Sequence, residues 1–161
     1  MTRELHGRDR ARQDDLWSWG MSRLRDTGTC EHCNGRFRYA LIHNGFNDSA
    51  HAYCDRCGRT ALLDARSDAI PEQAGFRPHG PIPVAAEPWL LPCECGGAFR
   101  AAASPRCPGC NRELSAEPAR AWIESQAPGA AKGWRWQGSW CGIYAIVVEG
   151  RVVENNWRRP A

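Results

Sequence analysis

Residues 51–58 read HAYCDRCG, in which two cysteines are separated by two residues and a glycine follows directly. The chain has nine cysteines among 161 residues, far above ordinary usage, and eight of them fall in four close pairs. The role of these pairs therefore decides the fold. The pairs stand at 30 and 33, 54 and 57, 93 and 95, and 107 and 110, and the ninth cysteine stands at 141.

The chain carries no export or membrane signal that the sequence makes visible. Its beginning, MTRELHGRDRARQDD (1–15), alternates charges and lacks the apolar stretch of a secretory signal. No segment approaches the ~18 apolar residues that a membrane span requires. We therefore expect a cytoplasmic protein without a membrane partner. Stable disulfides are rare in that reducing compartment, which favours metal ligation for the cysteine pairs.

The spacing of the pairs is typical of tetrahedral zinc sites. A gap of two residues bends the chain so that both sulfurs face one point, and two such turns supply four ligands. The first two pairs are separated by 20 residues, a separation common in zinc sites, and the last two by 11 residues. We therefore predict two zinc ions with ligands taken in chain order. The predicted sets are Cys30, Cys33, Cys54 and Cys57 for one ion, and Cys93, Cys95, Cys107 and Cys110 for the other.

Each pair is followed by a residue that enters left-handed backbone conformations easily. A zinc knuckle, the turn that holds two such cysteines, needs this residue so that the following amides fold back and donate hydrogen bonds to the thiolates. A thioredoxin-like redox pair would instead need a helix N-terminus beside a strand–helix pattern, which is not visible here. The four residues are Asn34, Gly58, Gly96 and Asn111.

Two stretches resemble the zinc-ribbon superfamily, whose two-knuckle modules occur in transcription factors, polymerase subunits and ribosomal proteins. CEHCNGRFRYALIHNGFNDSAHAYCDRCGRTALL (30–63) has the layout of knuckle, strand, turn, strand, knuckle and strand. CECGGAFRAAASPRCPGCNREL (93–114) resembles a shorter, rubredoxin-like ribbon, although its first arm is one residue tighter than usual. The resemblance implies a small, metal-stabilised, mainly β protein with two tandem zinc ribbons, and it leaves the function open.

Composition divides the chain into five segments. Residues 1–26 form a charged lead-in with a short helical pattern, and 27–68 form the first ribbon. Residues 69–92 are predicted to be an extended linker, because six of the eleven prolines fall between 71 and 92. The second ribbon, followed by a short helix that Ser115 caps, spans 93–126. A tryptophan-rich tail, 134–161, completes the chain.

The tail is predicted to contain a β-hairpin. Two β-rich runs, 143–148 and 151–154, flank the turn residues Glu149 and Gly150. A lone hairpin is marginal in water, so its tryptophans either fill a junction with the ribbons or form an interface, since Trp and Arg dominate binding hot spots. The odd Cys141 is expected to be a small buried hydrophobe. The predicted partner-binding residues are Trp134, Trp136, Trp140, Trp157 and Arg158.

These features point away from catalysis. No phosphate-binding glycine loop, nucleophile elbow or HExxH helix is present, and four thiolates leave zinc no open position. We expect a non-enzymatic module that docks a protein partner and takes no small-molecule substrate. The formal charge of +3 falls to about −1 when each tetrathiolate zinc centre contributes −2. The alternative is a nucleic-acid-binding ribbon, accessory to transcription or translation, that uses Arg36, Arg38, Arg56 and Arg59.

Overall fold

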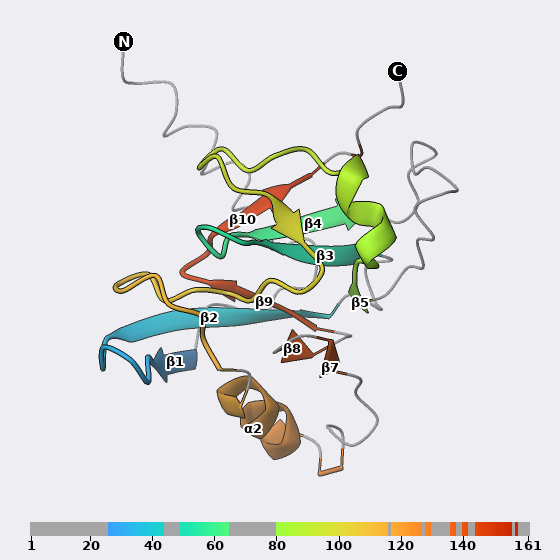
Figure 1. Ribbon diagram of the computed structural model, residues 1–161. Coiled ribbons are helices and arrows are strands. Elements are labelled where there is room, and N and C mark those ends of the chain that lie inside the picture. The colour runs from blue at the N-terminus through green and yellow to red at the C-terminus, as the bar shows by residue number, and fades with distance from the viewer. Residues whose placement is uncertain are drawn as a thin grey trace, which may run out of the picture.

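The computed structural model is small and mainly β (Figure 1). Its described residues form a three-stranded sheet, a five-stranded sheet and a two-stranded sheet, with few helical turns. No helix in the part of the chain that it describes is long and apolar enough to cross a membrane. The predicted N-terminal helix lies outside that part, as do Trp134 and Arg158. The described residues are 26–43, 49–64, 80–115, 117–126, 128–129, 136–137, 140–141, 144–155 and 157.

The first sheet has three strands in the order β1-β2-β9. β1 (Asp26–Thr29) and β9 (Tyr144–Val148) both pair antiparallel with β2 (Arg36–His43). The first half of β2 alternates as expected, with Phe37 buried between exposed arginines, whereas residues 39–42 are buried on both faces. β2 is therefore the central strand of this sheet.

The second sheet is built around β3 (Ser49–Cys54), which pairs antiparallel with β4 (Thr60–Asp64). It lies above the first sheet in Figure 1, with the 3-10 helix η2 (Val84–Trp89) at one edge, while α2 (Glu117–Gln126) lies below the first sheet. Two short strands, β5 (Gly80–Pro81) and β6 (Phe99–Arg100), also pair with β3. β10 (Val152–Glu154) runs parallel to β4. β7 (Trp136–Gln137) and β8 (Trp140–Cys141) pair with each other.

The prediction of two separate ribbons is wrong. In a ribbon, β2 and β3 would form a hairpin, but here they belong to different sheets. β6, which follows the third cysteine pair, instead pairs with β3, which precedes the second, through Tyr53 with Arg100 and Cys54 with Phe99. The two cysteine-rich stretches therefore build one interleaved unit.

The described half of the proline-rich segment is not an extended linker. β5 continues the edge of the second sheet, and η2 follows with Pro88 inside it. Ile82, Ala86 and Leu90 from this segment are buried in the core. Prolines are compatible with edge strands and short 3-10 turns. The high proline content of this segment therefore excludes only long helices and central strands.

The C-terminal strands occur where expected, but they do not pair as a hairpin. Glu149 and Gly150 have positive φ angles of 51° and 68°, and Arg151 N donates to Val148 O at 3.0 Å, so the tight turn forms. Val152 N then donates to Gly150 O at 3.0 Å and redirects the chain. β9 joins the first sheet and β10 the second, which makes this turn a corner between sheets.

The two sheets are joined by side chains that pair with the free edge of β9. The backbone N–H of Ile146 donates to the Tyr53 hydroxyl at 2.8 Å, and the Thr60 hydroxyl donates to Ile146 O at 2.8 Å. Among the described strands β9 is at the edge of its sheet, and these contacts satisfy its buried backbone on the side away from β2. His51, fully buried in β3, stays neutral because burial lowers its pKa to about 3.

We predict that Thr60→Val lowers the free energy of unfolding by about 1–3 kcal/mol, because it leaves the buried Ile146 carbonyl without a donor. Urea unfolding of the metal-loaded protein measures the change. The matched control is Thr27→Val on the exposed face of β1, which we expect to alter stability by less than about 0.5 kcal/mol. Equal effects of the two substitutions would contradict the role of this sheet-to-sheet hydrogen bond.

Candidate metal centres

The eight paired cysteines gather into two groups of four, but not in chain order. In each group the sulfur atoms all lie within 4.8 Å of one another. The predicted ligand sets are therefore wrong in their grouping, although all eight predicted residues are used. The outer centre consists of Cys30, Cys33, Cys107 and Cys110, and the inner centre consists of Cys54, Cys57, Cys93 and Cys95.

The separations between sulfur atoms fit one metal ion in each group. In the outer centre Cys30 Sγ lies 3.7 Å from Cys110 Sγ, and Cys33 Sγ lies 3.8 Å from Cys107 Sγ. The corresponding distances in the inner centre are 3.5 Å and 3.7 Å. A tetrahedral ion with metal–sulfur bonds of about 2.3 Å has sulfur–sulfur edges of about 3.8 Å, whereas a disulfide would require about 2.05 Å.

The four knuckles share one backbone design, as the sequence predicts. Asn34, Gly58, Gly96 and Asn111 have positive φ angles of 59°, 70°, 87° and 60°. The amide of each donates at 2.9 Å to the carbonyl of the first cysteine in its pair. In the third knuckle this bond spans three residues rather than four, because only one residue separates its cysteines. The shorter arm therefore closes into the same kind of turn.

Backbone amides donate to sulfur in both centres. Gly35 N lies 3.4 Å from Cys33 Sγ, and Gly97 N lies 3.4 Å from Cys95 Sγ. The first cysteine of every pair is buried, with an exposed fraction of 6% or less, and the second is more open. Each knuckle thus places one thiolate in a hydrophobic core and supports its charge with oriented N–H groups.

Strand pairing explains why the groups are nested. The pairing of β6 with β3 brings the third knuckle to the second, and Asp55 N donates to Ala98 O at 2.9 Å beside them. The fourth knuckle is closed at its base by a bridge between Arg106 and Glu113, and its Cys107 packs in the same core as Cys30. The first and fourth knuckles therefore meet outside the inner pair.

A family profile of a domain of unknown function, DUF8255, matches residues 26–116. This segment is more than half of the chain and contains all eight cysteines of the two centres. The chain belongs to the DUF8255 family. No curated protein and no solved structure matches the chain significantly. The DUF8255 segment ends before α2, so β9 and β10, which complete the two sheets, lie beyond it.

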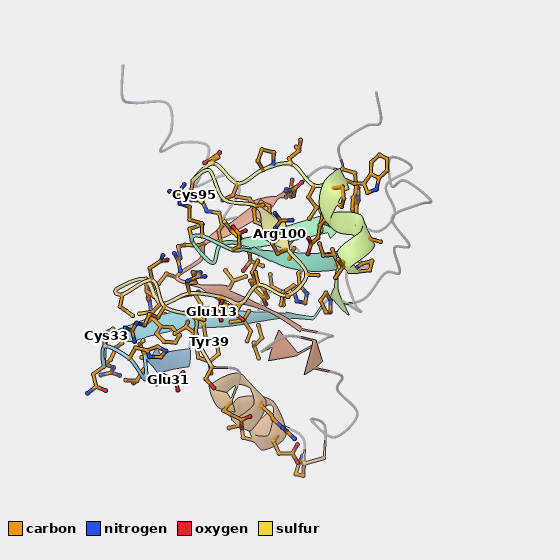
Figure 2. All side chains as sticks on the ribbon, in the orientation of Figure 1. Glu31, Cys33, Tyr39, Cys95, Arg100 and Glu113 are labelled. Atoms are coloured by element: carbon orange, nitrogen blue, oxygen red, sulfur yellow. The ribbon has the colours of Figure 1, made fainter. Side chains whose placement is uncertain are left out.

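The two centres of this DUF8255 protein lie at the same end of the sheets, as Cys33 and Cys95 show in Figure 2. Gly58 of the second knuckle packs so closely that a Cβ there would lie 2.3 Å from Arg106 N. The Asn111 side chain of the fourth knuckle donates to Arg56 O at 3.0 Å. Packing and hydrogen bonds thus connect the outer centre to the inner one.

Arg151 strengthens this connection, and local sequence gave no signal for its role. Its guanidinium donates to Cys57 O at 3.1 Å through one nitrogen and to Arg106 O at 2.8 Å through the other. Cys57 belongs to the inner centre, and Arg106 immediately precedes Cys107 of the outer centre. The positively charged guanidinium of Arg151 therefore joins the backbone of the two centres.

Burial raises the pKa of two thiols of the inner centre, Cys93 and Cys54, above the usual value for a thiol. Against the effect of burial, the Gly97 amide and the neighbouring cysteines lower the pKa of Cys95 to about 7. Without metal, Cys93 and Cys54 therefore hold their protons. A metal ion must displace these protons, so its affinity falls as the pH is lowered. Because the cores that bury these thiols form only when the chain folds, metal binding and folding depend on each other.

The tail residues are distributed differently from the prediction. Trp157 is only 5% exposed and lies in the core beside Leu90, with which it forms a β-bridge. Its assignment as a partner-binding residue is therefore corrected, because its ring is enclosed. Trp136 and Trp140 lie in β7 and β8, and Cys141 follows in β8, but the side chains of these three residues lie outside the described part.

Paired substitutions test the nested grouping. We expect Cys33→Ser combined with Cys107→Ser to leave about one metal ion per chain after purification in excess zinc, because both residues belong to the outer centre. The matched control, Cys33→Ser with Cys54→Ser, damages both centres and should retain less metal. Elemental analysis measures the content. Grouping in chain order predicts the reverse pattern, and finding it would reject the nesting.

We expect Arg151→Lys to lower the free energy of unfolding by about 1.5–3 kcal/mol, because lysine keeps the charge but cannot span both carbonyls. Metal release to a chelator should be faster as well. Both effects are measured against Arg36→Lys, a substitution at an exposed position of β2. If the two variants unfold and release metal alike, the fork does not connect the centres.

Proposed function

We propose that this protein is a non-enzymatic, zinc-binding interaction module that docks a protein partner, as an adaptor, an assembly subunit or a specific inhibitor. The proposal rests on the filled coordination sphere that each centre would give a metal ion. Each centre gathers four cysteine sulfurs, which fill the coordination sphere of a tetrahedral ion and leave no position for water or substrate. Zinc ions held in this way stabilise a fold and do not perform chemistry.

Zinc is the ion that these donors favour. Four thiolates at the corners of a tetrahedron suit zinc, whereas magnesium and calcium require oxygen ligands. The two ions would supply much of the folding energy, since the described core is divided into small clusters around the knuckles. Iron in four cysteines has the same geometry, and its red colour would distinguish it.

The charged surface favours a protein partner over nucleic acid. Three of the four arginines proposed for phosphate binding have contacts within the chain. Arg38 Nε lies 3.9 Å from a Glu149 carboxylate oxygen, and Arg59 lies 3.4 Å from Glu94. Arg56 donates at 3.0 Å to a carbonyl of the inner centre. Each zinc tetrathiolate adds a net charge of −2 nearby, which opposes binding to phosphates.

Affinity capture tests the proposal. The tagged, zinc-loaded full chain should recover a defined protein from lysate with and without nuclease. Trp140→Ala, in the predicted partner-binding tail, should reduce recovery by about tenfold or more if it is a hot spot. Zinc content is measured in both proteins to show that folding is unchanged. Retention on heparin with a steep salt dependence, and loss of the protein after nuclease, would favour the nucleic-acid alternative.

A further inference from the structure

One edge of the outer centre, between Cys33 and Cys107, is open to small molecules. The two sulfurs lie 3.8 Å apart, and Cys33 is exposed whereas Cys107 is buried. Exposed Gly109 lies beside this edge. A Cβ there would lie 3.7 Å from Cys107 Sγ and 3.8 Å from Cys33 Sγ, and no other described atom outside the adjoining residues lies within 4 Å. A molecule that approaches over Gly109 therefore meets both sulfurs.

The Cys33 sulfur is also uncovered on the side of its own knuckle. Gly35 follows the knuckle and places no side chain over the sulfur, which would be the one described contact of a Cβ there, at 3.1 Å. Cys33 lies at the periphery of the molecule (Figure 2). The two residues that face this sulfur most closely are thus both glycines, so the sulfur has little steric protection.

The corresponding edge of the inner centre is closed. Cys95 is exposed as well, and its sulfur lies 3.5 Å from that of buried Cys54. However, a Cβ at Gly97 would lie only 2.7 Å from Cys54 Sγ and 2.7 Å from Arg56 Cβ. Arg56 is held over this knuckle by a hydrogen bond of 3.0 Å to Cys95 O. The tight packing leaves no room for an added methyl group, so a molecule cannot reach both sulfurs from this side.

Steric access is the property that separates the two exposed sulfurs. Oxidation of cysteine follows thiolate character and exposure, and every cysteine bound to a metal is a thiolate. Hydrogen bonding does not distinguish the two either, because Cys33 accepts from Gly35 N and Cys95 from Gly97 N, both at 3.4 Å. The outer centre is therefore the more susceptible of the two to an oxidant.

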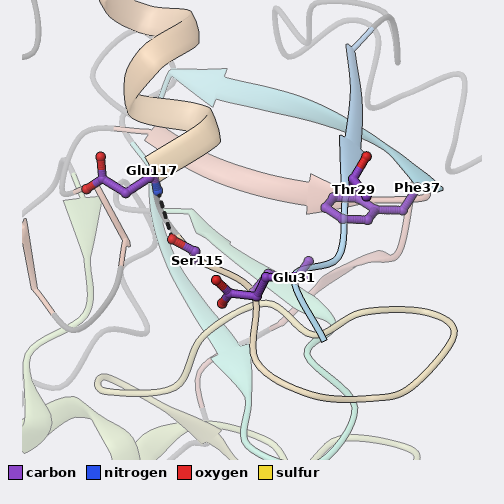
Figure 3. A pocket seen from close by; sticks show the side chains of 6 residues that line it. Thr29, Glu31, Phe37, Ser115 and Glu117 are labelled. Atoms are coloured by element: carbon purple, nitrogen blue, oxygen red, sulfur yellow. Dashed lines mark hydrogen bonds between the residues drawn. The ribbon is translucent and has the colours of Figure 1, made fainter. Parts of the chain in front are cut away.

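A cavity near the first knuckle gives no second route to the sulfurs (Figure 3). It has a volume of ≈ 290 Å³ and lies where the end of β1 and the first knuckle meet β2 and the start of α2. No cysteine is among the residues that line it. An oxidant in this cavity would not contact the outer centre, which leaves the edge beside Gly109 as the route.

We propose that the Cys33–Cys107 edge is a site of reversible oxidation by a peroxide. The Cys33 thiolate attacks one peroxide oxygen and breaks the O–O bond, which gives a sulfenic acid and hydroxide. The Cys107 thiolate then attacks the Cys33 sulfur, forms the S–S bond and expels a second hydroxide. Two thiolates thus lose two electrons, and hydrogen peroxide with two protons becomes two waters.

The oxidised outer centre keeps the thiolates of Cys30 and Cys110 and loses its metal ion, since two ligands fill only half of a tetrahedral site. The inner centre is unchanged, and the new disulfide keeps the first and fourth knuckles together. A dithiol reductant returns the two electrons and restores the site. This inference goes beyond the proposed docking function and does not depend on it.

Zinc release from the loaded full chain tests the inference. Hydrogen peroxide is added in the presence of a chromogenic chelator, and we expect about one of the two zinc ions to be released in a first, faster phase. Peptide mapping after the remaining thiols are blocked should join Cys33 to Cys107. Dithiothreitol with added zinc should then restore the original metal content. Release of both ions at one rate, a different disulfide, or failure to reload the centre would overturn the proposal.

Variants at Gly109 test the route. Gly109→Val places methyl groups over both sulfurs and should slow the first phase about tenfold, because oxidation depends on exposure. The control, Ala102→Val, adds the same groups at an exposed position outside both centres and should leave the rate unchanged.

Zinc content before oxidation shows whether each variant retains both ions. If Gly109→Val does not, the smaller Gly109→Ala replaces it, because its Cβ makes only ordinary contacts with the two sulfurs. Slower release from the metal-loaded Gly109 variant supports the proposed edge. Release as fast as from Ala102→Val shows that the oxidant does not enter over Gly109 and overturns the assignment.

Discussion

The fold depends on bringing four sulfur atoms to one point twice, from parts of the chain that are far apart. Cys30 and Cys110 are 80 residues apart in sequence, and Cys54 and Cys95 are 41 apart. The core beside the inner centre is small and rich in alanine, so packing alone gives limited stability to a chain of this kind. Metal ligation would stabilise segments whose own strands are only two to eight residues long.

The elements that the sequence predicted well are those that short-range chemistry determines. Asn34 and Asn111 adopt left-handed conformations because the knuckle requires them and because asparagine tolerates them. The turn at Glu149 and Gly150 also forms where expected. In each case the residues that specify the structure are within a few positions of one another, so the pattern is visible without knowledge of distant partners.

The elements that the sequence did not predict depend on pairing between distant segments. Four knuckles with nearly the same local design can combine into two pairs in three ways. Their spacing along the sequence favoured pairs of neighbouring knuckles. The choice is made by β6, which pairs with β3, and by Arg151, which binds carbonyls beside both centres. The buried positions of Ile82 and Trp157 follow from the same interleaving, since both pack in the core that contains the inner centre.

The nested order of the ligand pairs also has a consequence for the way the chain folds during synthesis. The second knuckle can meet the third once residue 95 has emerged, whereas the first must wait for residue 110. Doubling a loop adds only about 0.6 kcal/mol to its closure cost, and the inner centre shortens the outer loop once it has formed. Each later knuckle can therefore pair with one that has already been synthesised. β9 and β10 are synthesised last and complete the two larger sheets.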